Sequence, residues 1–350
     1  MSPVRRVPTT VKAVVYSTSG PSSVLSLVER EPAEPGAGGV RVRVAVSGVN
    51  PTDWKARAGG TRRGDFAEVV PNQDGAGIVD GVGEGVTHLG VGDRVWLYLA
   101  QHEQAGGTAQ EYVVLPASRV ARLPDGVDFA VGASLGVPAI TAHRALTVHE
   151  NGPARLSPGA LAGRVVLVAG GAGAVGHAAI QLARWADATV IATVSSEEKA
   201  ALARAAGAHH VIDYKTEPVA DRVLAIAPDG VDHIVEVSIA ANAETDLAIA
   251  ANHASIAFYA DNGGDAFRLP TRPGFAKNLR FQGVLLYTMG ARALDAAASD
   301  IQAALEDGAL PVGTESGLPL TWFPLEATAA AHDAVEDGYV GKVLIRVADL

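Results

Sequence analysis

The stretch VVLVAGGAGAVGHAAIQLAR, residues 165–184, decides the fold. Its apolar start, residues 165–169, predicts a buried strand, and the long run after residue 173 predicts an amphipathic helix. Between them Gly171, Gly173 and Gly176 spell G-x-G-x-x-G where the strand passes into the helix. In that context the pattern predicts a dinucleotide-binding loop, and the alternative is a tight glycine-rich turn without a ligand.

Each glycine of this pattern has its own expected task. The first permits the turn, the second lets a pyrophosphate approach the backbone, and the third lets helix and strand pack closely. Amides at the start of the helix supply the positive potential that a pyrophosphate needs. The cofactor-binding residues predicted here are Gly171, Ala172, Gly173, Ala174, Val175 and Gly176.

The surrounding sequence predicts an α/β protein. Residues 11–127 read as short alternating strands separated by glycine, proline and aspartate clusters, as in VRVRVAVSGV at 40–49. From about residue 130 to 269 strands alternate with helices, which predicts a doubly wound parallel sheet. A helix at about 292–307 and a final strand, KVLIRV at 342–347, follow.

The residues after the second strand of the alternating region favour NADP over NAD. An NAD site usually has an acidic residue about 20 positions after the first glycine. Here TVIATV runs into Ser195 and Ser196, Lys199 lies one helical turn further, and Tyr214 closes the next strand. Hydroxyls, an ammonium and a phenol suit a 2'-phosphate. In the alternative interpretation, Ser195 and Glu198 form a capping box and Lys199 is only solvated.

With 350 residues and 48% hydrophobic content, the chain is expected to form two domains, each with its own hydrophobic core. The composition also excludes several classes of function. A net charge of -10 argues against nucleic acid as a partner. The chain has no cysteine, which excludes disulfides, thiol catalysis and thiolate metal sites. No stretch of about 18 apolar residues occurs, so we expect no membrane association and a soluble, cytoplasmic protein.

Seven motifs together carry a resemblance to a known family. They are SGVNPTDWKARAG (47–59), PNQDGAGIV (71–79), VGDRVW (91–96), GVPAITAHRAL (136–146), AGGAGAVG (169–176), AAGAHHVIDY (205–214) and GKVLI (341–345). Over essentially its full length the chain resembles the zinc-independent quinone oxidoreductases of the medium-chain dehydrogenase/reductase superfamily, the group that includes zeta-crystallin. The resemblance implies a GroES-like β-barrel catalytic domain, residues 1–131 and 277–350, and a Rossmann NADP(H)-binding domain, residues 132–276, with the active-site cleft at their junction.

The resemblance also implies roles for single residues. Lys199 and Tyr214 match positions that hold the 2'-phosphate and adenosine side of NADPH. Thr141 matches a threonine near the nicotinamide, and Asn50 and Asp53 match polar residues of the nicotinamide and substrate pocket. Taken alone, Asn50 and Asp53 read as turn residues flanking Pro51.

In two places the chain departs from the family's pattern. Lys55 stands where an aromatic residue often faces the substrate, and HENGPARLSPGALAG (149–163) is a longer approach to the glycine motif.

A catalytic zinc site is not predicted. The related zinc dehydrogenases need a cysteine near position 50 and a histidine-glutamate pair near 73, where this chain has Asn50, Gln73 and Asp74. His209 and His210 are expected at the surface rather than on a metal. With no metal, and no nucleophile beside a base, the chemistry is expected to reside in the cofactor.

We therefore expect NADPH-dependent hydride transfer to a quinone or a related electron-poor carbonyl compound. Two alternatives stay open: reduction of activated C=C bonds in enones or enoyl thioesters, and a low-turnover structural or regulatory protein that binds NADPH. The resemblance further implies a homodimer through the edge of the parallel sheet, near the apolar run VLLYTM at 284–289.

Overall fold

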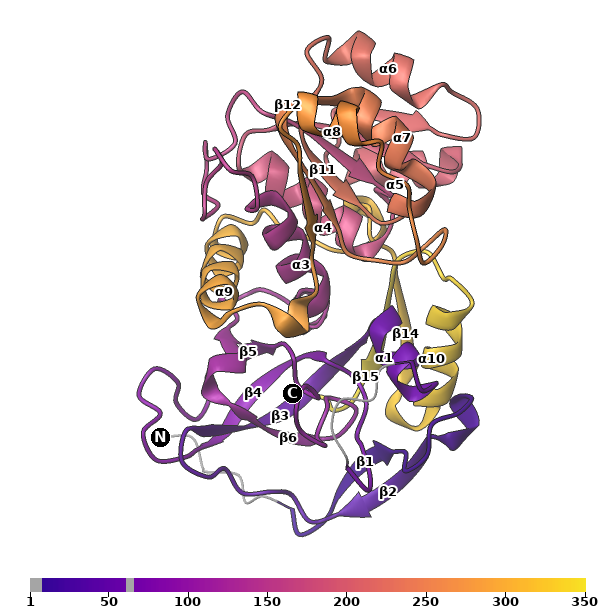
Figure 1. Ribbon diagram of the computed structural model, residues 1–350. Coiled ribbons are helices and arrows are strands. Elements are labelled where there is room, and N and C mark those ends of the chain that lie inside the picture. The colour runs from indigo at the N-terminus through magenta and orange to yellow at the C-terminus, as the bar shows by residue number, and fades with distance from the viewer. Residues whose placement is uncertain (1–7, 61–65) are drawn as a thin grey trace. The chain divides into compact units, whose positions relative to one another are not determined.

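The computed structural model describes residues 8–60 and 66–350, which form two compact units (Figure 1). The first unit contains the described residues up to Val137 together with Leu320–Leu350, and the second unit is Pro138–Pro319. Both ends of the chain therefore belong to one unit, and the glycine motif lies in the other.

The second unit is built on a six-stranded sheet in which every pair of neighbours is parallel. The strand order is β10-β9-β8-β11-β12-β13, so the order reverses beside β8, as in doubly wound dinucleotide-binding sheets. The strands are β8 (Val165–Ala169), β9 (Thr189–Val194), β10 (His210–Asp213), β11 (Val231–Glu236), β12 (Ala250–Phe258) and β13 (Arg280–Gly283).

The apolar faces of α6 and α7 pack against the sheet of this unit. Buried residues of α6 and α7, such as Val223 and Ile239, pack with Leu167, Ile191 and Ile234 of the strands in one core cluster. Burial of this apolar surface is the main stabilising term for the unit. The helices are α3 (Gly136–Leu146), α4 (Ala174–Trp185), α5 (Glu197–Ala205), α6 (Val219–Ile226), α7 (Ile239–Ile249), α8 (Thr271–Ala276) and α9 (Ala291–Glu306), with the 3-10 turns η3 (Leu286–Thr288) and η4 (Thr314–Ser316).

The first unit is built on a mostly antiparallel seven-stranded sheet with a separate hairpin. Alternate residues of β3, such as Val40, Val42 and Val44, are buried in its core, as the alternating sequence predicts. The elements are β1 (Val11–Val15), β2 (Ser26–Arg30), β3 (Gly39–Val49), β4 (Asp74–Val82), β5 (Arg94–Leu97), β6 (Tyr112–Pro116), β7 (Val120–Arg122), β14 (Leu320–Pro324), β15 (Lys342–Arg346), α1 (Pro51–Arg57), α2 (Phe129–Gly132) and α10 (Thr328–Glu336), with the 3-10 turns η1 (Ser22–Val24), η2 (Ala117–Arg119) and η5 (Leu325–Ala327).

The compact units divide at different residues from the predicted domain limits of 131/132 and 276/277. Residues 277–319 belong to the second unit because β13 pairs in register with β12, and because Asp300 of α9 is hydrogen bonded to His143 of α3. At the other limit, the amide of Val137 donates to Asp74 of the first unit. Both limits depend on contacts between segments that are distant in the sequence, which a linear pattern does not reveal.

No helix in residues 8–60 and 66–350 is both long and apolar enough to span a membrane. The apolar run VLLYTM follows the edge strand β13 and continues into η3. Leu285 in this run is half exposed.

Candidate active site

The loop between β8 and α4 uses two glycines of the motif for packing. A Cβ added at Gly171 would lie 2.9 Å from the Cβ of Ala192, and one added at Gly176 would lie 2.3 Å from the carbonyl oxygen of Gly170. Both are closer than real Cβ contacts, so a side chain at either position would displace the strand or the helix. The first and third glycines are therefore required by the fold.

The middle glycine is different. Gly173 is exposed, its φ of -79° and ψ of 161° suit any residue, and an added Cβ would meet only the carbonyl oxygen of Gly170 at 3.5 Å. The chain alone has no need of glycine there. An open position beside the amides of a helix start fits a bound pyrophosphate, which must touch the backbone at this point.

Helix α4 begins directly at this loop. Gly173 is its N-cap and offers no side chain to the first-turn amides, and the first intrahelical bond runs from the His177 amide to Gly173. The amides of Ala174, Val175 and Gly176 precede that bond and have no partner within a helix. Gly171, Ala172 and Gly176 are buried, whereas Ala174 and Val175 are half-buried.

Ser195, Ser196 and Lys199 come together at the end of β9. The Lys199 ammonium donates to the Ser195 hydroxyl at 3.0 Å, and the Lys199 amide donates to the Ser196 hydroxyl at 3.3 Å. Ser196 is therefore the N-cap of α5, and the alternative capping box of Ser195 and Glu198 is not formed. The Ser195 hydroxyl and the Lys199 ammonium form a separate, half-buried polar pair.

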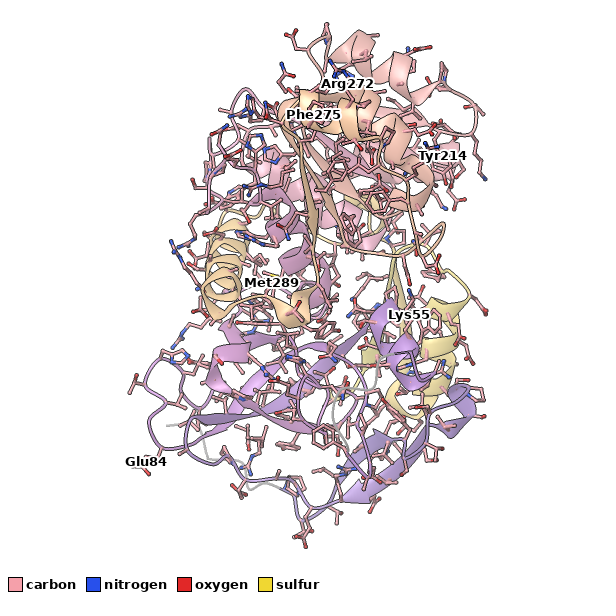
Figure 2. All side chains as sticks on the ribbon, in the orientation of Figure 1. Lys55, Glu84, Tyr214, Arg272, Phe275 and Met289 are labelled. Carbon is pink, nitrogen blue, oxygen red and sulfur yellow. The ribbon has the colours of Figure 1, made fainter. Side chains whose placement is uncertain are left out.

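Tyr214 lies beside the same edge of the sheet. Its amide donates to the carbonyl of Val194, the residue before Ser195. The ring is half exposed (labelled in Figure 2) and borders a cavity of about 220 Å³, which also touches Gly170 and Thr193. The structure thus gathers the glycine loop, the end of β9 and Tyr214 at the carboxyl edge of the sheet.

A buried pair of carboxyls, Glu236 and Asp246, also borders this cavity and was missed by the sequence analysis. Glu236 ends β11 and accepts hydrogen bonds from the Ser238 amide and, at 3.1 Å, from the Asn242 side chain. Burial raises the pKa of both carboxyls, and the charge of Glu236 raises that of Asp246 further. The signal available in the sequence was the acidic residue at the end of an apolar strand in DHIVEVS.

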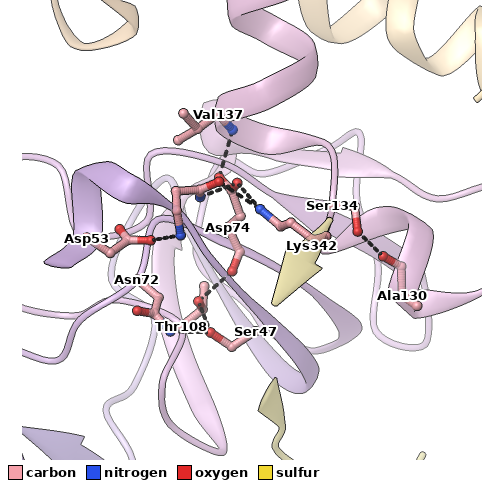
Figure 3. A network of polar contacts seen from close by, with 10 residues as sticks. Ser47, Asp53, Asn72, Asp74, Thr108, Ala130, Ser134, Val137 and Lys342 are labelled. Atoms are coloured by element: carbon pink, nitrogen blue, oxygen red, sulfur yellow. Dashed lines mark hydrogen bonds and ion pairs between the residues drawn. The ribbon is translucent and has the colours of Figure 1, made fainter. Parts of the chain in front are cut away.

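In the first unit, Asn50 is buried and hydrogen bonded to Asp74 and Lys342, two residues of the polar network that Figure 3 shows. Its side-chain oxygen accepts from the Lys342 ammonium at 2.7 Å, and its side-chain nitrogen donates to Asp74 at 2.6 Å. Lys342 also lies 3.6 Å from Asp74. Both ends of the Asn50 side chain are thus engaged by the protein, and Lys342 was not predicted to take part.

Asp53 holds the backbone of Asn50. One of its oxygens accepts from the Asn50 amide at 2.7 Å, which closes the capping box of α1. The other oxygen is buried and has no hydrogen-bond partner in the described part of the chain. Burial, and then the charge of Asp74, raises the pKa of Asp53 to about 8, although the amides of Asn50 and Gln73 and the charge of Lys342 lower it.

The remaining predicted residues lie in three places. Thr141 is buried in α3, in the other unit from Asn50 and Asp53. Lys55 is half-buried in α1, where it is labelled in Figure 2. His209 and His210 are exposed, as predicted, and a ring nitrogen of His209 accepts from the Val190 amide at 3.0 Å.

Two family models match this chain. Residues 36–125 match the alcohol dehydrogenase GroES-like domain, and residues 174–305 match the zinc-binding dehydrogenase model.

Full-length relatives and solved structures agree with these matches. The chain is 32% identical to a quinone oxidoreductase of Rattus norvegicus and 30% identical to one of Homo sapiens, covering 87% of this chain and 88% of each relative. A quinone oxidoreductase of Pseudomonas syringae pv. Tomato aligns with a TM-score of 0.79 at 28% identity, over 96% of this chain and 99% of that one. A mycobacterial protein complexed with NADPH aligns equally well, at 27% identity and with the same coverage.

Proposed function

Because the chain belongs to the quinone oxidoreductase family of medium-chain dehydrogenases/reductases, and is thus an oxidoreductase that uses a nicotinamide cofactor, we propose that it reduces quinones with NADPH. The observation that carries the proposal is the loop at the switch point of the parallel sheet. Neighbouring atoms leave no room for a side chain at its first and third glycines. The space beside Gly173, at the start of a helix, is open.

The residues present fit such a cofactor. The amides of the first turn of α4 would hold the pyrophosphate, because they have no partner within the helix and lie at its positive end. When bound, the nicotinamide supplies a hydride. The protein's own contribution is to hold the acceptor in line and to exclude water.

NADPH is preferred over NADH in this proposal because of the side chains at the end of β9. Ser195 and Lys199 already contact one another and together present an ammonium and a hydroxyl to a 2'-phosphate. Ser196 and Tyr214 would flank the adenosine side. The mycobacterial relative complexed with NADPH supports this choice.

Asn50, Asp53 and Thr141 are proposed to serve the nicotinamide and the acceptor. The Asn50 side chain keeps one donor hydrogen and one lone pair beyond its bonds to Asp74 and Lys342. Its geometry is fixed by these bonds, so any contact that it makes to a ligand is made by a rigid group. The buried, unpaired oxygen of Asp53 is the second polar feature of this network.

An acceptor panel tests the proposed function. Purified protein is mixed with NADPH or NADH and with a quinone, an enone or an enoyl thioester, and cofactor absorbance is followed. We expect NADPH consumption with the quinone, little with NADH, and none in the Gly173→Val variant. Consumption with the enone or thioester alone would assign a C=C reductase, and persistence of bound NADPH with every acceptor would assign a binding protein with little turnover.

We also propose that the protein is a homodimer. Strand β13 is an edge of the six-stranded sheet, and the half-exposed Leu285 follows it directly. An edge strand beside apolar residues is suited to pairing with a second copy. Light scattering of the purified protein would give the mass of the dimer if this is correct and the mass of one chain if it is wrong.

A further inference from the structure

The second unit contains an open groove of about 1000 Å³ that has no part in the proposed reaction. It runs between α3 and α9, which lie side by side in Figure 1, and the segment after α3 closes one side. Its volume is at the upper end of the range for small-molecule sites. The residues that line it include His143, Arg144, Arg155, Gly290, Arg292 and Asp295.

The groove has a fixed frame. Asp300 of α9 is buried and accepts three hydrogen bonds of 2.7 Å, from the His143 ring, the Arg155 guanidinium and the Leu156 amide. Arg155 also donates to Ser299 at 2.9 Å. These bonds connect α3, α9 and the segment that follows α3. The walls of the groove are therefore held in place without a ligand.

The charge of the groove is opposite to that of the protein. Three arginines and one aspartate, Asp295, line it, whereas the chain as a whole has a net charge of -10. Arg155 is neutralised by Asp300. Arg144 and Arg292 have no hydrogen-bond or ion-pair partner in the part of the chain that the structure describes, which leaves two guanidinium groups available to an anion.

The start of helix α9 also favours an anion. Helix α9, 16 residues long, starts at the groove with Gly290 as N-cap, without a capping side chain and without an acidic residue in its first turn. The positive end of its dipole is therefore uncompensated there.

One wall of the groove is formed by the segment after α3. Ala154 and Arg155, which line the groove, belong to residues 149–163 of this segment. The bond between Arg155 and Asp300 places that segment against α9. The groove thus depends on residues outside the proposed cofactor site.

We propose that this groove is a binding site for the phosphate or diphosphate group of a small molecule, separate from the cofactor site. The guanidinium groups of Arg144 and Arg292 bind the anion, because a planar fork of donors matches phosphate oxygens. Arg155, held by Asp300, lines the wall beside them. The small side chains of Ala154, Ala293 and Ala296 leave room for the rest of the ligand.

Inorganic pyrophosphate is the probe for this site, titrated calorimetrically into the whole protein at constant ionic strength with chloride. We expect the double variant Arg144→Gln/Arg292→Gln to bind it about tenfold more weakly or worse, and to keep its affinity for NADPH. Arg222→Gln is the matched control, because Arg222 is an exposed arginine of the same unit that pairs with Glu217. Gly173→Val is the reciprocal control and should lose NADPH but keep pyrophosphate.

Several results would overturn the proposal. Pyrophosphate that fails to bind the wild-type protein at millimolar concentration would do so, as would an equal loss in Arg222→Gln. Loss of pyrophosphate binding in Gly173→Val, with normal binding in the arginine double variant, would place the anion at the cofactor loop instead. Citrate that binds with the same affinity and the same dependence on Arg144 and Arg292 would show a general polyanion site rather than one for phosphate. None of these results depends on which acceptor the enzyme reduces.

Discussion

At the residue scale, Gly173 gives the sharpest test of cofactor binding, because the fold itself does not require a glycine at this position. Gly173→Val introduces a branched side chain into space that the chain leaves open. We expect thermal stability close to wild type and at least a tenfold loss of NADPH affinity, because the pyrophosphate can no longer reach the backbone.

Gly176→Val is its matched control, since a Cβ there would lie 2.3 Å from the Gly170 carbonyl oxygen and should destabilise the fold instead. A folded Gly173→Val protein that binds NADPH normally would show that the loop is only a turn and does not bind the cofactor.

Lys199 decides the choice of cofactor in the proposed function. Replacing it with alanine removes a charge-assisted contact to the 2'-phosphate, worth roughly 1.5–3 kcal/mol when shielded. Lys199 is half-buried, so screening by solvent places the loss at the lower end, about tenfold in NADPH affinity. NADH, which has no such phosphate, should bind as before. Equal losses for the two cofactors would contradict a phosphate role.

Asp53 gives the protein a predictable dependence on pH. Its pKa is raised from 3.8 to about 8, so folding takes up a proton between these values. The free energy of unfolding therefore falls as pH rises from about 4 to about 8, and the loss is complete above that range. Asp53→Asn removes this contribution, so its stability relative to wild type should increase with pH over the same range. Denaturant titrations of both proteins at pH 5, 7 and 9 measure the difference, and parallel pH profiles would show that Asp53 is not protonated in the folded protein.

At the scale of elements, the start of α5 separates helix capping from the proposed recognition of the cofactor. Ser196 is the N-cap, whereas the Ser195 hydroxyl accepts a hydrogen bond from the Lys199 ammonium. Ser196→Ala should cost about 1 kcal/mol of stability, as the loss of a cap does. Ser195→Ala should leave the helix intact and lower the NADPH to NADH affinity ratio. Calorimetric melting and cofactor titration of both variants test this, and a larger loss of stability in Ser195→Ala would reverse the assignment.

The elements themselves follow from local patterns. The predicted helix at 292–307 is α9 at Ala291–Glu306, and the predicted strand at 342–347 is β15 at Lys342–Arg346. The alternation of strands and helices gives the parallel sheet in which the glycine loop sits at the reversal of strand order. Periodicity and turn residues act over a few positions, so sequence alone carries this information.

At the scale of the whole molecule, we predict that the activity needs no metal. Lys342 places an ammonium beside Asn50 and Asp74, at the positions where zinc dehydrogenases have ligands. A cation already balances the charge of Asp74 there. Dialysis against a strong chelator should therefore leave NADPH oxidation unchanged. Stoichiometric zinc in a metal analysis, with activity lost when it is removed, would contradict this prediction.

The sequence by itself determined the fold class, the place of the glycine loop between strand and helix, and the cluster of polar residues after β9, because each depends on neighbours close in the chain. Ser195 and Lys199, for example, meet across one turn at the start of a helix.

Only the tertiary structure decided which distant residues meet. Lys342 binds Asn50 from 292 positions away, Asp300 holds His143 and Arg155 around a groove, and Glu236 shares a cavity wall with Asp246. Pairing of β13 with β12 likewise moved residues 277–319 into the second unit. The physical reason is that burial and charge depend on what packs around a side chain, and packing partners are chosen by the whole fold rather than by local spacing.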